Sequence, residues 1–179
     1  MSFYEKLVQN QTEFIHFRQK ISRQRQVMIS KACKYGIRAA IFVASRKGSN
    51  TKLSVKEIAR EVQIPEAFTA KIMQTLNKHR IITSLKGPYG GFYIEQHQLD
   101  QPVLNIVNAI DGMSVFRECG LGLKNCSESR PCPMHFKYKE VREALLHAFQ
   151  ETTVGQLATD LNAGGSFLSN LMVEENPHI

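Results

Sequence analysis

The sequence predicts a mainly α-helical protein with one small β-hairpin, an α+β fold that ends in a long C-terminal helix. Three observations support this prediction. Apolar residues recur at helical spacing along most of the 179 residues. Two short β-prone runs, 81–85 and 91–94, flank a glycine-rich turn and are typical of a hairpin. The segment 134–155 has one narrow apolar seam among charged residues, a pattern typical of a long helix that pairs with another.

Charge is distributed unevenly along the chain. The formal net charge is +7, made up of +3 in residues 1–27, +8 in 28–99 and −4 in 100–179. A basic middle section is typical of a nucleic-acid-binding module, although a solvated basic surface would give the same count. No run of eighteen apolar residues exists, so no membrane span is expected. Without an apolar leader the chain is expected to be cytoplasmic, with reduced thiols.

The first helical segments precede the basic section. Residues 1–27 are treated as an N-terminal extension, either helical over 3–26 or an artefact of the assigned start, because Met28 is itself a candidate start. A second apolar stripe predicts a helix over 31–45.

The middle of the chain predicts two helices joined by a short turn. Ser54 can cap a helix over 55–61, with Glu57 completing a capping box. Pro65 suits the start of a second helix over 66–79. Such a pair is a helix-turn-helix, and the hairpin that follows is a wing. Residues 28–100 are therefore predicted to form a winged helix-turn-helix DNA-binding domain.

The second helix of a helix-turn-helix enters the major groove of DNA. Lys71 could read guanine and Gln74 could read adenine, while a lysine on the wing could meet phosphate. Each residue alone could equally be a solvated side chain, but the joint pattern with the local charge favours DNA binding. Glu66 also lies at the start of this helix. The residues assigned to DNA binding are Lys31, Lys34, Arg38, Ser54, Thr69, Ala70, Lys71, Gln74, Lys86, Tyr89, Gly90 and Gly91.

The C-terminal part divides into four predicted segments. Residues 101–112 are a connecting section with a helix over 102–110, and 113–133 are a cysteine-rich loop. Residues 134–155 are the long helix, assigned to dimerisation, although packing on its own core would give a similar stripe. Residues 156–179 are expected to be a flexible tail.

Three of the four cysteines lie in this loop, spaced Cys119-x(6)-Cys126-x(5)-Cys132, with His135 three residues later. Thiolates suit iron–sulfur clusters and zinc, and the glycines and proline favour a loop that can wrap around a metal centre. A thiol redox switch and a loop that binds nothing remain alternatives. Cys33 is expected to be a small buried hydrophobic residue.

Several stretches resemble one bacterial family. These are 34–44, 54–94 with its wing string KGPYGGF, 103–112, the three cysteines, and 152–158. They are similar to the winged-helix regulators that include the iron–sulfur regulator IscR and the nitric-oxide sensor NsrR. The resemblance implies a homodimeric transcription factor that binds double-stranded DNA at a palindromic operator. It also implies a cluster, 2Fe–2S as in IscR, bound by Cys119, Cys126, Cys132 and His135, with structural zinc as the alternative cofactor.

Two positions depart from the family pattern. Ala70 stands where IscR-like members carry a glutamate linked to cluster-dependent DNA preference, which is therefore not expected here. Lys34 stands where NsrR-like members carry an acidic fourth ligand, and a lysine cannot replace it. The sequence therefore predicts a cluster-switched DNA-binding regulator. The alternative is a winged-helix protein with a zinc or thiol-redox site and no cluster sensing. No enzyme is expected, because no nucleophile–base set, phosphate loop or carboxylate pair stands out.

Overall fold

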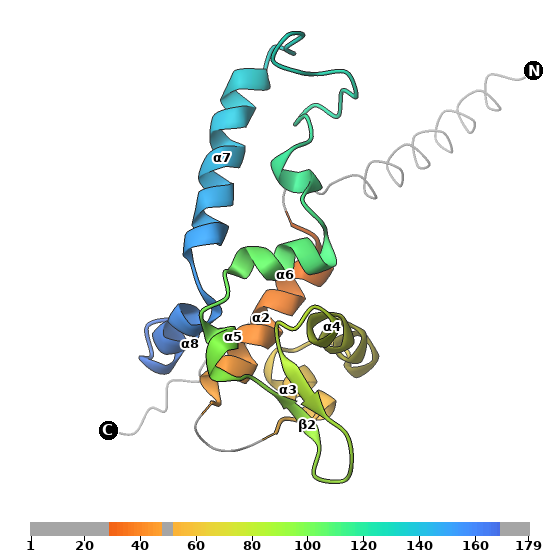
Figure 1. The fold of residues 1–179 in the computed structure, drawn as a ribbon, viewed down its shortest axis with the longest axis vertical. Helices are drawn as coiled ribbons and strands as arrows, with labels where there is room; N and C mark the ends of the chain where they lie inside the picture. Colours follow the sequence, from red (N-terminus) through yellow and green to blue (C-terminus); the bar gives the residue numbers. More distant parts are fainter. Residues whose placement is uncertain (1–28, 48–51, 169–179) are drawn as a thin grey trace, which may run out of the picture.

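A computed structural model of the chain describes residues 29–47 and 52–168 (Figure 1). The helix predicted over 3–26 lies outside these ranges. Within them, the structure is mostly helical with one two-stranded antiparallel sheet, which confirms the predicted fold class. No helix in the described part of the chain is both long and apolar enough to cross a membrane.

The first described helix is α2 (Lys31–Ser45), at the centre of the DNA-binding domain. It begins where the hydroxyl of Ser30 accepts a hydrogen bond from the backbone N–H of Cys33 at 2.9 Å. Its apolar face is buried through residues such as Ala40 and Val43. The helix has the bounds that the sequence predicts.

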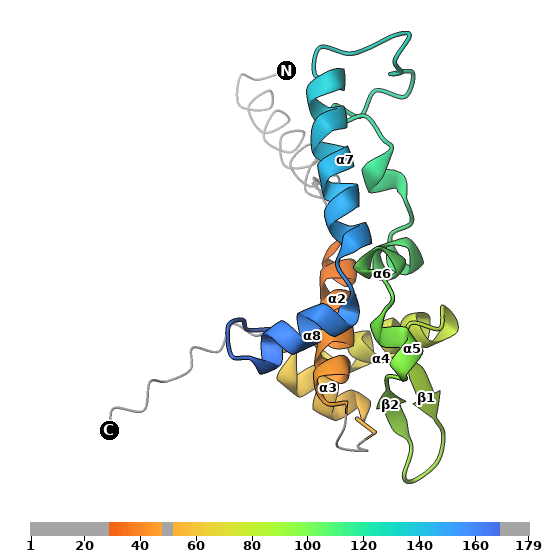
Figure 2. The ribbon, with the colours of Figure 1, turned by 60° about the vertical axis from the view of Figure 1, so that its left-hand side comes forward.

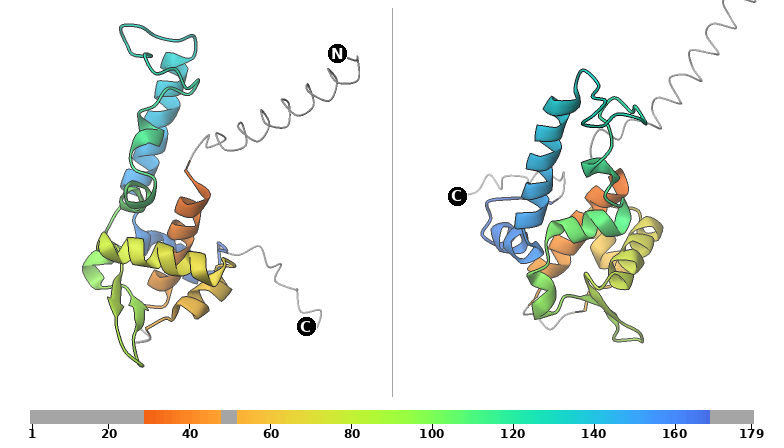
Figure 3. Two further views of the ribbon diagram at one scale, coloured as in Figure 1. Left: turned by 90° about the vertical axis from the view of Figure 1, so that its right-hand side faces the viewer. Right: turned by 45° about the horizontal axis from the view of Figure 1, so that its top comes forward.

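The helix-turn-helix is formed by α3 (Val55–Glu61) and α4 (Glu66–Lys78). The predicted capping box is confirmed, since Ser54 and Glu57 bond to each other's backbone N–H groups at the start of α3. The turn between the helices contains Gln63 at a positive φ of 53°. Apolar residues of both helices enter the main core, and α4 lies across one side of the domain (Figure 3).

The wing consists of β1 (Thr83–Leu85) and β2 (Gly91–Tyr93), paired antiparallel with Ser84 opposite Phe92. Leu53 adds a short bridge to β2 at Phe92. A Cβ at Gly91 would lie 2.8 Å from the carbonyl oxygen of Leu53, and the φ of Gly91 is +154°. Only glycine therefore allows this close approach between the strand and the segment before α3.

Three short elements follow the wing: α5 (Gln96–Leu99), α6 (Val103–Ile110) and the 3₁₀ helix η1 (Ser114–Phe116). Helix α6, which was predicted over 102–110, begins one residue later than predicted. Helix α5 was not predicted. The polypeptide then forms the cysteine-rich loop and enters α7 (His135–Glu151). In Figures 1 and 2, α7 extends away from the DNA-binding domain and the loop lies at its far end.

The predicted helix over 134–155 is wrong at its C-terminal end. Helix α7 ends at Glu151, and a separate helix, α8 (Val154–Asn162), follows it. Thr153 caps α8 through a capping box with Gln156. The extended backbone at Thr152 accepts a hydrogen bond from the N–H of Val103 at 2.9 Å. The predicted flexible tail over 156–179 is therefore also wrong for its first part.

Two groups of buried side chains hold these elements together. The main core joins α2, α3, α4 and the strand ends, and α8 completes it with Val154 and Ala158. A second cluster lies around Cys33, Val107 and Phe116, and the inner side of α7 packs on it through residues including Phe149. One side of the α7 stripe therefore packs on the protein's own core, as the alternative interpretation of the sequence held.

Candidate metal centre and nucleic-acid surface

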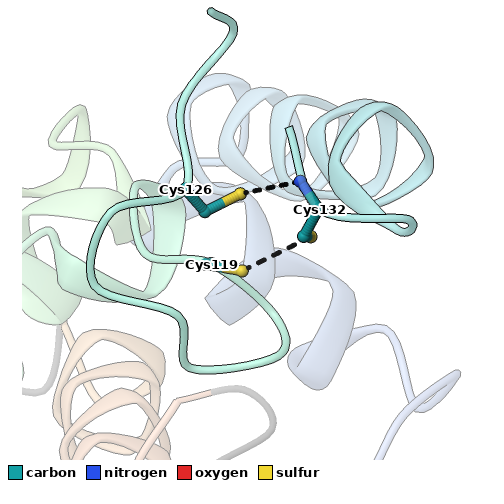
Figure 4. Close-up of side chains that lie close together, drawn as sticks. All are labelled: Cys119, Cys126 and Cys132. Carbon is teal, nitrogen blue, oxygen red and sulfur yellow. Dashed lines mark hydrogen bonds between the residues drawn. The ribbon is translucent and has the colours of Figure 1, made fainter. Parts of the chain in front are cut away.

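The three loop cysteines converge between η1 and α7. The sulfur atoms of Cys119, Cys126 and Cys132 all lie within 4.8 Å of one another, and those of Cys119 and Cys132 are 3.7 Å apart. Figure 4 shows the three side chains pointing toward a common centre. Tight backbone turns produce this arrangement: the carbonyl of Cys119 accepts from the N–H of Gly122 at 2.8 Å, and that of Cys132 from His135 at 2.9 Å.

His135 is the first residue of α7 and is only 9% exposed. Its Nδ1 lies 3.1 Å from the sulfur of Cys126. Its Nε2 is buried and has no hydrogen-bond partner within the described part of the chain. The structure thus places the fourth predicted ligand next to one cysteine, whereas the group whose donor atoms all lie within 4.8 Å consists of the three thiols. Three thiols and a buried imidazole nitrogen fit an iron–sulfur cluster or a soft metal ion.

The thiols differ in their ease of ionisation. Hydrogen bonds from the backbone at Leu123 and Leu121 lower the pKa of the Cys119 thiol to about 7, which favours the thiolate that metals require. Loss of hydration raises the pKa of Cys132 above its ordinary value. Burial raises the pKa of Cys33 to about 12, with the charge of Asp111 adding to the effect.

A hollow of about 300 Å³ lies beside Cys126 and Cys132. Lys124 and Arg130 line it. The hollow belongs to the same site, because two of the three converging cysteines form its wall. Two cations beside thiolates reduce the local build-up of negative charge.

The residues predicted to contact DNA come from α2, from the segment before α3, from α4 and from the wing. Exposed members are Lys31 and Lys34 on α2, Lys71 and Gln74 on α4, Lys86 and Tyr89 at the wing, and Ser54 before α3. Tyr89 is 91% exposed at the wing tip. Ala70, Gly90 and Gly91 are half-buried. The side-chain oxygen of Ser54 bonds to Glu57, so it is engaged in capping α3.

Two of the assigned residues need correction. Thr69 is 0% exposed, and its hydroxyl donates to the carbonyl of Pro65 at 3.1 Å, so it does not present its side chain to DNA. Arg38 is half-buried, and its guanidinium donates to the carbonyls of Val62 and Leu168, the latter at 2.6 Å. The Arg38 guanidinium therefore links α2 to the residue after α3 and to Leu168, which leaves fewer of its donors for a phosphate.

Sequence reasoning missed a residue that supports the wing. Gln98 is 2% exposed; its Oε1 accepts from the N–H of Glu95 at 2.8 Å, and its Nε2 donates to the carbonyl of Arg80 at 3.0 Å. The hydroxyl of Thr83, in β1, also donates to Gln98. The Glu-x-x-Gln pattern of a capping box was the available signal, because the structure shows that box at the start of α5.

The two candidate sites lie far apart within the chain. The cysteine loop is at the outer end of α7, and the wing is at the opposite end of the molecule (Figure 1). The fold and the two sites together define a winged helix-turn-helix DNA-binding protein with a thiol-rich candidate metal centre.

Comparison with known proteins places this architecture in one family. The Rrf2 family model, described as an iron-dependent transcriptional regulator, matches residues 29–160. The chain therefore belongs to the Rrf2 family of transcriptional regulators, which bind DNA, and the resemblance drawn from the sequence is confirmed.

Individual relatives agree with this assignment. A putative HTH-type transcriptional regulator of Aquifex aeolicus is 29% identical over 133 residues, covering 73% of this chain and 91% of the relative. The solved structure of CymR, the global cysteine regulator of B. subtilis, has a TM-score of 0.61 at 21% identity and covers 74% of this chain and 96% of its own. T. potens IscR has a TM-score of 0.61 at 19% identity, with 78% and 91% covered. At these identities the two structures establish the shared fold.

Proposed function

We propose that this Rrf2-family regulator acts as a homodimer whose DNA affinity is controlled by an iron–sulfur cluster bound by Cys119, Cys126, Cys132 and His135. The observation that carries the proposal is the convergence of three sulfur atoms within 4.8 Å, with an imidazole nitrogen 3.1 Å from one of them. The Nε2 atom of the same ring is buried and has no hydrogen-bond partner in the described part of the chain, so no other side chain or backbone group there holds the ring.

Three of the four residues have distinct roles in this proposal. Cys119 supplies a thiolate that forms readily near neutral pH, because hydrogen bonds from the backbone at Leu123 and Leu121 lower its pKa to about 7. Cys126 lies between His135 and the backbone N–H of Cys132, which donates to its sulfur at 3.4 Å. His135 joins the site to α7, since it is the first residue of that helix. A bound cluster would supply electron storage and a site of attack for oxidants or nitric oxide.

The outer side of α7 supports the homodimer. Phe136 and Val141 are exposed on this helix, by 57% and 63%. Contact with a second copy of the chain would remove such apolar side chains from water, and a twofold dimer presents two copies of α4 to a palindromic operator. We accordingly propose a palindromic operator in double-stranded DNA and a cytoplasmic location.

The test is anaerobic reconstitution followed by absorbance and Mössbauer spectroscopy, which also establish whether the cluster is 2Fe–2S. DNA selection with the loaded and the cluster-free protein then measures the switch. We expect Cys126→Ala to abolish the chromophore and His135→Ala to leave a labile one, whereas Cys33→Ala keeps it. Retention of colour by Cys126→Ala, or equal binding of every DNA by both forms, would contradict the proposal.

Structural zinc is the second candidate, because three thiolates and one imidazole are also a common zinc ligand set. A colourless protein that contains one zinc per chain after anaerobic purification, and whose DNA selectivity is unchanged by reconstitution, would favour it. The same DNA assay compares the three signals to which a cluster could respond: iron–sulfur status, nitric oxide and redox state.

A further inference from the structure

The side of α7 that faces the cysteine loop carries two contacts to the chain around Cys119. Arg142 lies two turns into the helix, and its Nη1 donates to the backbone carbonyl of Glu118. The same nitrogen lies 3.4 Å from the carbonyl of Arg117. A guanidinium that donates to a main-chain carbonyl fixes the backbone whatever side chain that residue carries. Arg142 therefore holds the chain immediately before Cys119.

The residue after Cys119 is held by an aromatic ring. A Cβ built on Gly120 would lie 2.4 Å from three ring atoms of Tyr138, well inside the closest distance that real Cβ atoms show. The backbone of Gly120 thus packs directly on the ring. Gly120 does not have a φ in the left-handed region, so its conformation is open to any residue. A side chain at this position would therefore have to displace the ring of Tyr138.

Cys119 therefore lies between two residues that are both held against α7. Cys126 and Cys132 contact the same helix through His135, whose Nδ1 is near the sulfur of Cys126 and whose N–H donates to the carbonyl of Cys132. An ion pair between Lys139 and Glu128 adds a further link. That pair is exposed and contributes little. The Gly120 and Arg142 contacts are thus the ones that hold the chain on either side of Cys119 against α7.

We propose that Tyr138 and Arg142 are positioning residues that hold Cys119 in place for a thiolate-bound metal centre, with Gly120 packed on the Tyr138 ring as the critical contact. The proposal rests on the proposed function, because it assumes that the loop binds a centre. It adds that α7 forms one wall of the site. A site whose donors are held in place before binding loses less conformational freedom and keeps its ligand longer.

The experiment uses the full chain, reduced and metal-free, with anaerobic Co²⁺ as a spectroscopic probe for thiolate ligation. The variants are Gly120→Ala, Tyr138→Ala, their double mutant, Tyr138→Phe and Arg142→Gln. Gly165→Ala is the matched control, because a Cβ there meets nothing within 4 Å. Two quantities are measured: the rate at which a chelator removes Co²⁺, and amide hydrogen exchange over residues 117–122 in the metal-free protein.

We expect Gly120→Ala and Arg142→Gln to accelerate both the Co²⁺ loss and the exchange, by about tenfold to a hundredfold for the metal. Tyr138→Phe keeps the ring and should behave like wild type, as should Gly165→Ala. In the Tyr138→Ala background, Gly120→Ala should have little further effect, because the overlap with the ring is gone. Wild-type exchange and Co²⁺ loss in Gly120→Ala, or equal effects of that substitution with and without the ring, would overturn the proposal.

The failure of this inference is distinguishable from failure of the proposed function. If the variants behave as expected with Co²⁺ but iron–sulfur reconstitution gives no chromophore, the positioning role stands for a different metal and the cluster proposal fails. If the chromophore forms and is lost equally slowly in wild type and Gly120→Ala, the cluster proposal stands and the positioning role fails.

Discussion

The backbone N–H of Ser30 donates to Oδ2 of Asp111 across 2.6 Å and ties the first turn of α2 to the end of α6. The Ser30 hydroxyl donates to the other carboxylate oxygen and accepts from the N–H of Cys33. One carboxylate thus satisfies donors at the start of the central helix, where backbone N–H groups lack partners within the helix. The contact also connects the DNA-binding domain to the segment that leads to the cysteine loop.

Loss of this contact should destabilise the protein. Asp111→Ala is expected to lower the free energy of unfolding by about 2 kcal/mol, the usual size for hydrogen bonds to a charged group. Asp111→Asn keeps one acceptor oxygen and should cost less. Urea unfolding followed by circular dichroism gives the midpoints. Asp160→Ala, at an exposed position of α8, is the control. Equal midpoints for the Ala variants of Asp111 and Asp160 would show that the contact contributes nothing.

The capping box of α3 should give stability that depends on pH. Hydrogen bonds from Ser54 lower the pKa of Glu57 below its ordinary 4.5. The folded state therefore favours the ionised form, so this stabilisation is present above 4.5 and is lost as the pH falls below that value. Glu57→Gln should be less stable than wild type at neutral pH, and the gap should narrow in acid. Thermal unfolding at several pH values measures it.

Ser54→Ala provides the partner measurement, with an expected cost of about 1 kcal/mol for loss of an N-cap. In that background Glu57→Gln should change stability less, because the two residues form one unit. Additive effects of the two substitutions at neutral pH would mean that the box contributes no coupling.

Cys33 should be inert to alkylation in the folded protein. Burial raises its pKa to about 12, so almost no thiolate exists at neutral pH, and the side chain is 0% exposed. Iodoacetamide labelling of the metal-free protein, followed by peptide mass spectrometry, should modify the loop cysteines first and Cys33 only after unfolding in urea. Labelling of Cys33 at the rate of the loop cysteines without denaturant would contradict this environment.

Substitutions on α4 and on the wing should affect DNA binding differently. Lys71→Ala and Gln74→Ala are expected to relax base preference by about 1–3 kcal/mol at the base they contact. Lys86→Ala should weaken all sequences alike and reduce the salt slope by about 1. Selection from random DNA and titrations at several salt concentrations measure both effects. Lys137→Ala, exposed on α7, is the control. A uniform loss in all three variants would place the base-reading surface elsewhere.

Arg38 should contribute mainly to stability. Arg38→Ala removes donors to the carbonyls of Val62 and Leu168 and is expected to cost about 1–2 kcal/mol in urea unfolding. Arg38→Lys keeps the charge but loses the planar arrangement of donors, so it should also be destabilised. If Arg38→Lys matched wild type in stability and DNA affinity while Arg38→Ala lost only affinity, the residue would be a phosphate contact after all.

Much of the fold follows from local signals. Ser30 and Ser54 cap helices whose bounds match the prediction, because a cap is encoded within a few neighbouring residues. The break at Thr152 was missed because the apolar pattern continues through it. What stops α7 is pairing with the distant residues Val103 and Gln101, which a helical period does not reveal. The capping-box pattern Thr153-x-x-Gln156 was the sequence signal that a new helix begins here.

The sites were less predictable than the elements. The cysteine spacing identified the converging thiols, because all three lie in one short loop. The surface residues were harder. Thr69 lies on the buried face of α4 and not on the neighbouring exposed face. The carbonyl groups that accept hydrogen bonds from Arg38 belong to residues 24 and 130 positions away in the sequence. Contacts of this kind depend on tertiary packing and leave no mark in periodicity or composition.

After Thr152 the chain leaves α7 and packs on the main core as α8, and this path has a consequence for biosynthesis. Because α8 supplies Val154 and Ala158 to the main core, the DNA-binding domain remains incomplete until a segment beyond α7 has left the ribosome. The cysteine loop and α7 are synthesised before that point. The thiols therefore emerge from the exit tunnel while α2 still has an uncovered apolar face. During synthesis, the cysteine loop of the nascent chain precedes the finished DNA-binding domain.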